Sequence, residues 1–310
     1  MKVLLPDSVE LDLTLDDAVI YEVGKPIPDQ HLDAEVLVVW GNPSGMLADA
    51  ARRLKSLRWV QTLAAGPDAV VQAGFAPDVA ITCGIGLHDQ TVTEHTLAMV
   101  LAAARRLHLL VRAQIGHRWA EELGGIQPVR EPALFRTLRD ANVVIWGFGG
   151  IAATLAPILT TLGAKVTGVA RSAGERHGFP VVTAADLPDL LPATDLLISI
   201  LPATPETVRV INADVLAHLQ PHAWVVNVGR GSTLDEAALL NAVRSRRIAG
   251  AALDVFETEP LPIDAGFWDE PNIIITPHAA GGRPIGAESL ITENLAAFTE
   301  GRPLRNPVAR

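Results

Sequence analysis

The sequence predicts two α/β domains, each a doubly wound and mostly parallel sheet, with a cleft between them and a long helix linking them. Three observations carry this prediction: the length of 310 residues, a series of short apolar runs, and helical patterns that separate these runs. Because a domain usually has roughly 100–200 residues, a chain of this length favours two domains. Hydrophobic residues make up 49% of the chain and charged residues 19%, which is enough apolar material for two cores.

The strand candidates are mostly continuous apolar runs rather than alternating ones. Such runs are typical of strands buried on both faces, as in a parallel sheet that helices cover. Helical segments such as 237–246 lie between them, which predicts βαβ units. Strands are expected at 36–40, 59–63, 79–82, 143–146, 166–170, 196–201, 224–228, 249–255 and 273–276.

A long helix is expected between the two domains. It begins near Thr91, because Thr91 and Glu94 have the spacing of a capping box, and it runs to about Arg112. A second α/β series starts at Val143, and a last helix over 287–299 returns to the first domain. The predicted boundaries are 1–90 with 285–310 for one domain and 91–284 for the other. The cleft between them is the natural place for a site.

Composition and charge exclude several classes of protein. The net charge of −10 argues against a nucleic-acid-binding surface, which needs clustered positive charge. Cys83 is the only cysteine, so no intrachain disulfide forms and a reducing cytoplasm is expected. The apolar stretch 97–104 is far below the ~20 residues that span a bilayer, and the run before Pro6 is too short for a signal peptide. We expect a cytoplasmic protein that binds neither nucleic acid nor membrane, and no metal site.

A glycine-rich turn follows the strand predicted at 143–146. It reads Gly147-Phe148-Gly149-Gly150-Ile151-Ala152, which is G-x-G-x-x-A at the start of a helix. The first glycine allows a tight turn, the second lets the backbone approach a pyrophosphate, and the small third residue lets helix and strand pack closely. Free N–H groups at the helix start bind the phosphates. The alternative is a plain glycine-rich turn, but the strand before it and the helix after it favour a Rossmann-type dinucleotide site.

The end of the next strand predicts which dinucleotide is bound. An acidic residue about 20 residues past the glycines normally binds the ribose 2′-OH of NAD. Arg171 and Ser172 stand at that place here, and Arg176 and His177 follow. Arginine and a serine hydroxyl bind a 2′-phosphate, which predicts a preference for NADP(H), with NAD(H) as a second cofactor. The alternative is that Arg171 is a solvated loop cation and that both cofactors serve equally.

Three polar side chains, Arg230, Glu259 and His278, follow neighbouring strands of the second series. In open α/β sheets, ligands lie beyond the carboxyl ends of the strands. Arginine holds a carboxylate in a two-point contact, histidine donates a proton as hydride reaches a carbonyl carbon, and glutamate fixes the histidine tautomer. Each alone has an ordinary explanation: a strand-end cap, a surface charge and a packed core histidine. Together they predict the reduction of a 2-keto acid.

These segments resemble the D-isomer-specific 2-hydroxyacid dehydrogenase family, which includes glyoxylate, hydroxypyruvate and phosphoglycerate enzymes. The resemblance runs from about Trp59 onward. It implies two Rossmann-like domains, of which 1–90 with 285–310 binds the substrate and 91–284 binds the dinucleotide. It also implies a homodimer and NAD(P)H-dependent reduction of small 2-keto acids to D-2-hydroxy acids, with His278 as proton donor, Glu259 as its partner and Arg230 as substrate anchor. Besides the glycine-rich turn, it rests on LPATPET at 201–207, NVGRG at 227–231, DVFETEPLP at 254–262 and TPHAAGG at 276–282.

The resemblance also implies where cofactor and substrate bind. Asp254 would lie near the nicotinamide. In the first domain, 63–68 resembles the family's substrate loop, where the N–H groups of Ala65 and Gly66 bind the carboxylate. Pro67 departs from the usual small aliphatic residue, removes an N–H and stiffens this loop. The full expected cofactor-binding set is Gly147, Phe148, Gly149, Gly150, Ile151, Arg171, Ser172, Pro202, Thr207, Val228, Asp254 and Gly281.

Other functions and the choice of substrate stay open. One alternative is a cofactor-sensing regulatory protein on the same scaffold. Another is a different Rossmann enzyme such as an amino-acid dehydrogenase, although no motif suited to ammonium is found. The short chain favours small substrates such as glyoxylate and hydroxypyruvate. Trp40 and Arg283 either face the substrate or are a packed aromatic and a surface cation, and the homodimer contact is expected over the long helix and 116–132.

Overall fold

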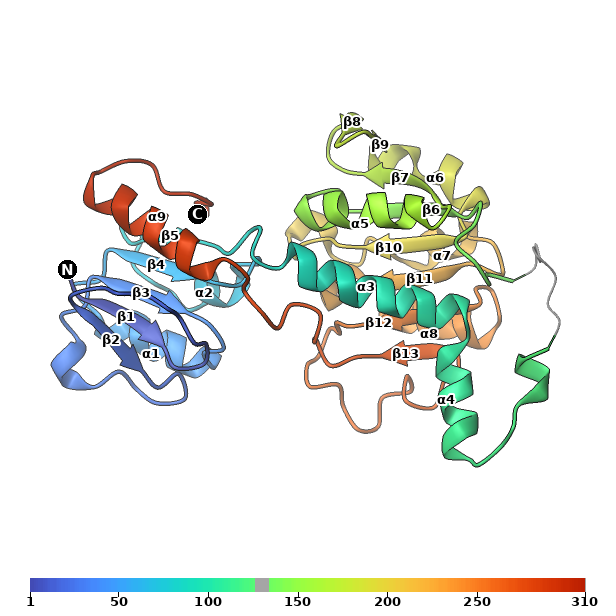
Figure 1. The fold of residues 1–310 in the computed structure, drawn as a ribbon, viewed down its shortest axis with the longest axis horizontal. Helices are drawn as coiled ribbons and strands as arrows, with labels where there is room; N and C mark the ends of the chain where they lie inside the picture. Colours follow the sequence, from blue (N-terminus) through green and yellow to red (C-terminus); the bar gives the residue numbers. More distant parts are fainter. Residues whose placement is uncertain (126–133, 310) are drawn as a thin grey trace. The chain divides into compact units, whose positions relative to one another are not determined.

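The computed structural model describes residues 1–125 and 134–309, which form two compact units (Figure 1). Unit 1 comprises Met1–His88 and Arg283–Arg310, and unit 2 comprises Asp89–Gly282. Each unit contains a mostly parallel sheet with helices on both faces. The predicted fold class, two doubly wound α/β domains, is confirmed.

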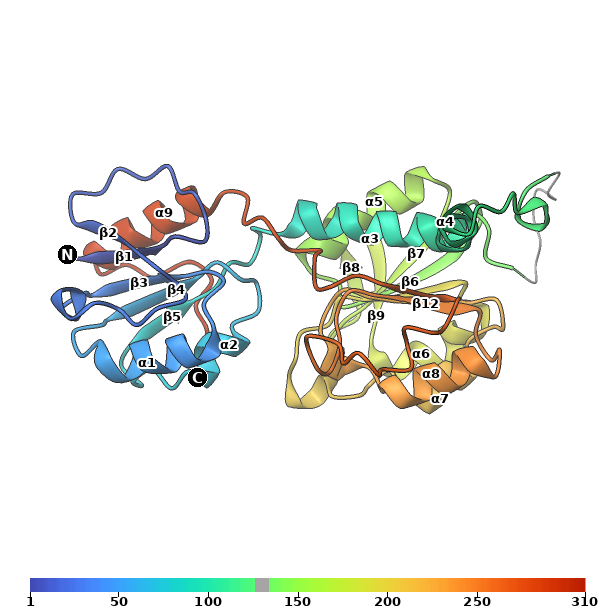
Figure 2. The same cartoon turned by 90° about the horizontal axis from the view of Figure 1, so that it is seen from below.

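Unit 1 is built on a five-stranded parallel sheet in the order β2-β1-β3-β4-β5. Figure 2 shows α9 on one face of this sheet and α1 and α2 on the other. The strands are β1 (Val3–Pro6), β2 (Ala18–Tyr21), β3 (Val36–Val39), β4 (Trp59–Thr62) and β5 (Ala80–Thr82). The helices are α1 (Ser44–Arg53), α2 (Asp68–Gln72) and α9 (Ala287–Thr299).

Burial on both faces explains the continuous apolar strands of unit 1. In β1, Leu4 packs in the same core cluster as Leu47 of α1. Val3 and Leu5 point the other way and pack in a cluster with Leu290 of α9. Successive side chains of a strand face opposite sides, so a strand covered by helices on both faces is apolar throughout.

A buried polar network fixes the last helix to the sheet of unit 1. Thr82 accepts a hydrogen bond from the indole N–H of Trp59 at 2.8 Å and donates to Oε1 of Gln61 at 2.7 Å. Asn294 of α9 donates to the same Gln61 oxygen at 2.9 Å. Because buried polar groups are costly without partners, this network specifies how α9 packs. The predicted helix over 287–299 and its return to the first unit are confirmed.

Unit 2 contains an eight-stranded sheet in the order β13-β12-β11-β10-β6-β7-β9-β8, in which only the pairing of β8 with β9 is antiparallel. The chain runs outward from β6 through β7 to the β8–β9 hairpin at the edge and then returns to β10 on the other side of β6. At such a reversal of strand order, open α/β sheets bind their ligands. The strands are β6 (Asn142–Trp146), β7 (Lys165–Val169), β8 (Gly174–Arg176), β9 (Phe179–Val182), β10 (Leu196–Ser199), β11 (Trp224–Asn227), β12 (Gly250–Leu253) and β13 (Ile273–Ile275).

Helices cover both faces of this sheet (Figure 2). On one face lie α3 (Asp89–Ala104) and α5 (Gly150–Thr161), whose apolar side chains join one core cluster. On the other face lie α6 (Leu187–Leu190), α7 (Ala213–His218) and α8 (Glu236–Arg244). Short 3-10 turns are η1 (Asp29–His31), η2 (Glu121–Leu123), η3 (Ala184–Asp186), η4 (Leu191–Ala193), η5 (Pro205–Thr207) and η6 (Gly231–Thr233).

The prediction of one long helix from Thr91 to Arg112 is wrong. Helix α3 begins at Asp89, so Thr91 lies inside the helix rather than at its cap, and α3 ends at Ala104. Helix α4 (Leu107–Ile115) follows after Arg106, whose φ of 53° is left-handed. A left-handed residue cannot continue a right-handed helix. No glycine or proline marks this break in the sequence, and the pattern therefore predicted one continuous helix.

Candidate active site

The predicted functional residues of unit 2 follow strands that end at one edge of its sheet. The glycine-rich turn follows β6, Arg230 follows β11, Asp254 follows β12, and His278 follows β13. Strands β11, β12 and β13 are adjacent and parallel, so the segments after them begin side by side. The sheet therefore gathers at one edge the residue types that the sequence singled out.

The glycine-rich turn has the geometry that a pyrophosphate needs. Gly147 has a φ of 103°, and a Cβ there would lie 2.6 Å from the carbonyl oxygen of Ile200. No side chain fits in that place, and only glycine adopts that backbone readily. Gly149, just before α5, has no heavy atom within 4 Å of the position a Cβ would take. This open space beside the N-terminus of a twelve-residue helix suits an approaching phosphate.

Other residues of the turn are fixed by packing. Phe148 is buried against Gly168, where a Cβ would lie 2.4 Å from the ring, so it offers a ligand only its backbone. A Cβ on Gly150 would lie 2.3 Å from a carboxylate oxygen of Asp89, and the Ile151 carbonyl accepts the hydroxyl of Thr93 at 3.3 Å. Gly150 and Ile151 thus lie where α3 packs against α5.

The loop after β7 carries the predicted 2′-phosphate ligands. Arg171 and Ser172 are both exposed. Arg176 of β8 donates to the Ser172 hydroxyl at 2.7 Å and to the Phe148 carbonyl at 3.4 Å, so it ties this loop to the glycine-rich turn. The β8–β9 hairpin that carries Arg176 was not predicted, because β8 is a polar three-residue edge strand without an apolar pattern.

Three further residues of the expected cofactor set are held by local contacts. The Thr207 hydroxyl donates to the Pro202 carbonyl at 2.6 Å, so the hydroxyl closes its own turn. Val228 is buried, and its N–H donates to the Ser199 carbonyl of β10 at 3.1 Å. These contacts fix the chain after β10 and β11.

Asp254 organises the loop that carries His278, a role that the sequence did not predict. Its buried carboxylate accepts the Thr276 hydroxyl at 2.6 Å and the N–H groups of Ala279 and Ala280 at 2.8 and 3.1 Å. Its carbonyl accepts the N–H of His278 at 2.8 Å. The expected cofactor residue Gly281 is half-buried and follows this loop directly.

His278 and Glu259 are in direct contact. Nδ1 of His278 lies 2.7 Å from Oε2 of Glu259, and the other carboxylate oxygen accepts the N–H of Phe256 at 2.9 Å. The two side chains are 46% and 36% exposed. Since Nδ1 faces the carboxylate, Nε2 is the nitrogen through which the imidazole can exchange a proton with a bound ligand. An imidazole held in this way by a carboxylate can act as a general acid.

Arg230 lies on a turn that packs against the segment carrying Glu259. Its carbonyl accepts the Asn227 amide at 3.1 Å and the Thr233 hydroxyl at 2.7 Å, which fixes the backbone of the turn. A Cβ on the next residue, Gly231, would lie 1.9 Å from the carbonyl carbon of Phe256. The second glycine of NVGRG is therefore required because the backbone of the Glu259 segment occupies that space.

In unit 1, the predicted substrate loop is held from both sides. The carbonyl of Leu63 accepts Nε2 of His88 at 2.8 Å, and the carbonyl of Ala64 accepts the N–H of Gly84 at 2.7 Å. Within the described residues, the N–H groups of Ala65 and Gly66 donate no hydrogen bond. They can therefore receive an anionic ligand. Pro67 forms the N-cap of α2 without a capping side chain.

The two candidate specificity residues differ in their surroundings. Trp40 is half-buried and stacks on His88, with ring centroids 5.2 Å apart and planes at 17°. His88 in turn holds the start of the substrate loop and was not singled out in the sequence. Arg283 is exposed.

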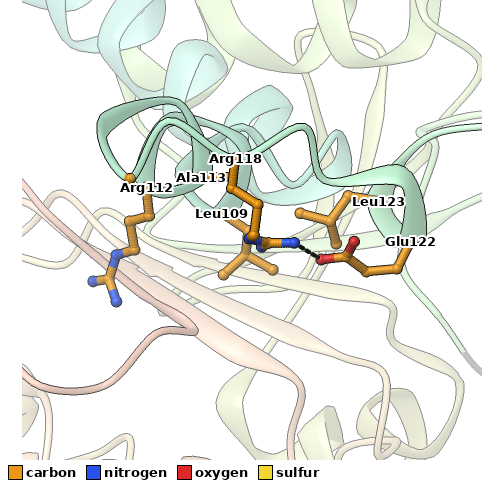
Figure 3. A pocket seen from close by; sticks show the side chains of 7 residues that line it. Leu109, Arg112, Ala113, Arg118, Glu122 and Leu123 are labelled. Atoms are coloured by element: carbon orange, nitrogen blue, oxygen red, sulfur yellow. Dashed lines mark hydrogen bonds and ion pairs between the residues drawn. The ribbon is translucent and has the colours of Figure 1, made fainter.

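A separate pocket of about 330 Å³ lies beside α4 (Figure 3). Arg118 lies 2.5 Å from the carboxylate of Glu122, and Figure 3 shows this ion pair among the side chains that line the pocket. The pocket is lined by Leu109, Arg112, Ala113, Gly116, Arg118, Glu122 and Leu123.

In the part of the chain that the structure describes, no helix is long and apolar enough to cross a bilayer. Among the same residues, no group of three or more His, Cys, Asp or Glu side chains is arranged to hold a metal ion.

Comparison with known families decides the relationship of the chain. The family model described as D-isomer specific 2-hydroxyacid dehydrogenase, NAD binding domain, matches residues 97–280 of this chain. The chain belongs to this family. The resemblance noted in the sequence is confirmed, and the protein is an oxidoreductase of the D-isomer specific 2-hydroxyacid dehydrogenases.

Relatives within the D-isomer specific 2-hydroxyacid dehydrogenases extend over most of the chain. Glyoxylate/hydroxypyruvate reductase A of Serratia proteamaculans is 32% identical, covering 89% of this chain and 86% of the relative. The structure of a family member from Xanthobacter autotrophicus, in complex with NADPH and MES, has a TM-score of 0.77 at 34% identity and covers 94% and 90% of the two chains. The NADPH-dependent glyoxylate/hydroxypyruvate reductase of Sinorhizobium meliloti, in complex with NADP and sulfate, has a TM-score of 0.82 at 26% identity, with 99% and 98% covered.

Proposed function

We propose that this protein reduces small 2-keto acids to D-2-hydroxy acids with NADPH and that His278 donates the proton. The contact between His278 and Glu259 carries this proposal, because it holds a proton donor at the sheet edge where the glycine-rich turn also lies. Relatives named glyoxylate/hydroxypyruvate reductases make glyoxylate and hydroxypyruvate the first substrates to test. The test is to follow the loss of NADPH absorbance with each of these two keto acids and with a panel of longer keto acids. We expect glyoxylate and hydroxypyruvate to oxidise NADPH.

The cofactor would be held by residues of unit 2. The turn at 147–152 would receive the pyrophosphate on its N–H groups, since Gly149 leaves open space there. Arg171 and Ser172 would bind the 2′-phosphate, and Arg176 would hold Ser172 in place. When bound, the nicotinamide supplies the hydride that reduces C2 of the keto acid. Further contacts are proposed for Pro202, Thr207, Val228, Asp254 and Gly281.

The residues of the chain then perform the acid–base and binding steps. Arg230 holds the substrate carboxylate and polarises the carbonyl. In unit 1, the N–H groups of Ala65 and Gly66 are proposed as further ligands of a substrate carboxylate. Nε2 of His278 gives its proton to the carbonyl oxygen as negative charge develops there. Glu259 accepts the hydrogen bond from Nδ1 and so keeps the proton on Nδ1 before and after the transfer.

Removing the positive charge of Arg171 should weaken the use of NADPH selectively. One charge-assisted hydrogen bond contributes about 1.5–3 kcal/mol, so R171A should lower kcat/KM for NADPH by about 10- to 100-fold. The value for NADH should stay within about twofold, because NADH has no 2′-phosphate. Initial rates with both cofactors measure this. R302A, which removes an exposed arginine of unit 1, is the matched control. A wild-type enzyme that uses NADH as well as NADPH would contradict the assignment.

We infer a homodimer that forms through α4 and the segment after it. Leu107, Leu110, Val111 and Ile115 lie at helical spacing on α4 and are 37% to 74% exposed. Trp119, in the predicted contact region, is 89% exposed. The rest of that region, 126–132, lies outside the described residues. An exposed apolar face of this kind is typical of an interaction surface.

Sedimentation should show a dimer at micromolar concentration, and I115D should shift the protein toward monomer. Burying an unpaired carboxylate in an apolar interface is unfavourable. I20D is a matched control, since Ile20 is equally exposed at 74% but lies in β2 of unit 1. A wild-type protein that sediments only as a monomer would rule out this interface.

A further inference from the structure

The segment that carries Glu259 is held by a second carboxylate, outside the predicted site. Glu236, the first residue of α8, accepts the N–H of Glu257 on Oε1 at 2.6 Å. The preceding N–H, that of Phe256, donates to Glu259 itself at 2.9 Å. Two consecutive amides are thus held by two carboxylates, and only Glu259 also contacts His278.

The peptide between Phe256 and Glu257 is closely packed. A Cβ on Gly231 would lie 1.9 Å from its carbonyl carbon and 2.4 Å from its nitrogen. Arg209 contacts the Glu257 side chain at 3.0 Å, but these two side chains are 55% and 44% exposed, and such surface pairs stabilise weakly. The hydrogen bond to Glu236 is therefore the contact that fixes the direction of the Glu257 N–H.

Glu236 is also electrostatically close to the proton-donating pair. Partial burial raises the pKa of Glu236 above its ordinary value, and the charges of Glu257 and Glu259 raise it further. Its hydrogen bond to the Glu257 N–H acts in the opposite direction. The carboxylates of Glu236, Glu257 and Glu259 therefore lie close together.

Resting on the proposed function, we propose that Glu236 is a positioning residue: by holding the N–H of Glu257, it keeps the Glu259 carboxylate against Nδ1 of His278. Residue 236 then needs a side chain long enough to reach the Glu257 N–H and an oxygen that accepts its hydrogen bond. Glutamine keeps both. Aspartate keeps the charge but is one methylene shorter, and alanine keeps neither.

Kinetics of four variants test the role of Glu236. In E236A and E236D, kcat with glyoxylate and NADPH should fall on the order of tenfold or more, because a small misplacement of a catalytic group is costly. The KM for glyoxylate should stay within about threefold of the wild-type value, because Glu236 is not proposed to contact the substrate. E236Q should stay within about threefold of wild type, and E293Q, which breaks an exposed ion pair with Arg305 in unit 1, should match wild type. NADPH affinity should be unchanged in all four.

Hydrogen exchange of the Glu257 amide tests the same contact without turnover. The amide should be protected in the wild type and E236Q and should exchange faster in E236A and E236D. Equal protection in all variants, or an unchanged kcat in E236D, would overturn the proposal. A parallel loss of stability, NADPH binding and turnover would instead assign Glu236 a general structural role. If E236A does not fold, the comparison of E236D with E236Q decides. If the wild type reduces no keto acid, the proposed function fails while the exchange result still tests the contact.

Discussion

Replacing His278 with alanine should lower kcat for keto-acid reduction by about 10³-fold, within the range that a positioned general acid contributes. The variant loses the Nε2 proton and leaves Glu259 without its 2.7 Å partner. Affinity for NADPH should stay within about twofold, because the pyrophosphate and 2′-phosphate are assigned to other segments. Steady-state kinetics and fluorescence titration of NADPH measure the two quantities separately.

The conservative variant H278Q separates proton donation from packing. Glutamine fills similar space and donates a hydrogen bond, but it has no proton to transfer near neutral pH. Its turnover should therefore be as low as that of H278A. H218A, which removes an exposed histidine of α7, is the matched control and should behave as wild type. Turnover of H278A close to the wild-type value would remove His278 from the mechanism.

Replacing Arg230 with alanine should reduce kcat/KM for keto acids by about 10²- to 10⁴-fold. The guanidinium is proposed to make two charge-assisted hydrogen bonds to the substrate carboxylate, each contributing about 1.5–3 kcal/mol. The KM for the keto acid should rise, because the substrate carboxylate loses its partner. The kcat should fall as well, because Arg230 is also proposed to polarise the carbonyl. R230K should be intermediate, since lysine keeps the charge but not the planar two-point contact.

A neutral analogue gives the control for Arg230. An amide of the keto acid lacks the carboxylate, so R230A should slow its reduction much less than it slows the reduction of the keto acid, and the remaining loss measures the polarisation of the carbonyl. The carbonyl of residue 230, which accepts from Asn227 and Thr233, is retained in the variant, so the turn should persist. Wild-type saturation of R230A by glyoxylate would refute the anchor assignment.

Much of the fold could be predicted because burial on both faces leaves a clear mark on the sequence. All nine predicted strands coincide with strands of the two sheets, with ends that differ by a few residues. Strands β1 and β2 were missed, as was the β8–β9 hairpin. The first is four residues long and ends at Pro6, and the second is an edge strand whose Ile20 is 74% exposed. The break at Arg106 was missed because arginine is a good helix former and only its backbone dihedral reveals the turn.

The candidate site could be predicted where it depends on residue type at the end of a strand. A parallel sheet brings such residues to one edge, and His278 contacts Glu259 although they are nineteen positions apart. The contacts of the Asp254 and Glu236 carboxylates could not be predicted, because each carboxylate accepts hydrogen bonds from backbone amides that are distant in sequence. The residue types along the chain do not reveal which backbone N–H groups lie outside helices and strands and need a side-chain acceptor.

Transfer of deuterium from NADPH labelled at C4 to glyoxylate is the most direct test of the account. The product, examined by mass spectrometry, should carry the label at C2 when the wild-type enzyme turns over, and H278A should form the same labelled product far more slowly. Tight binding of NADPH without any labelled 2-hydroxy acid, over a full panel of keto acids, would contradict the account and indicate a cofactor-sensing protein instead.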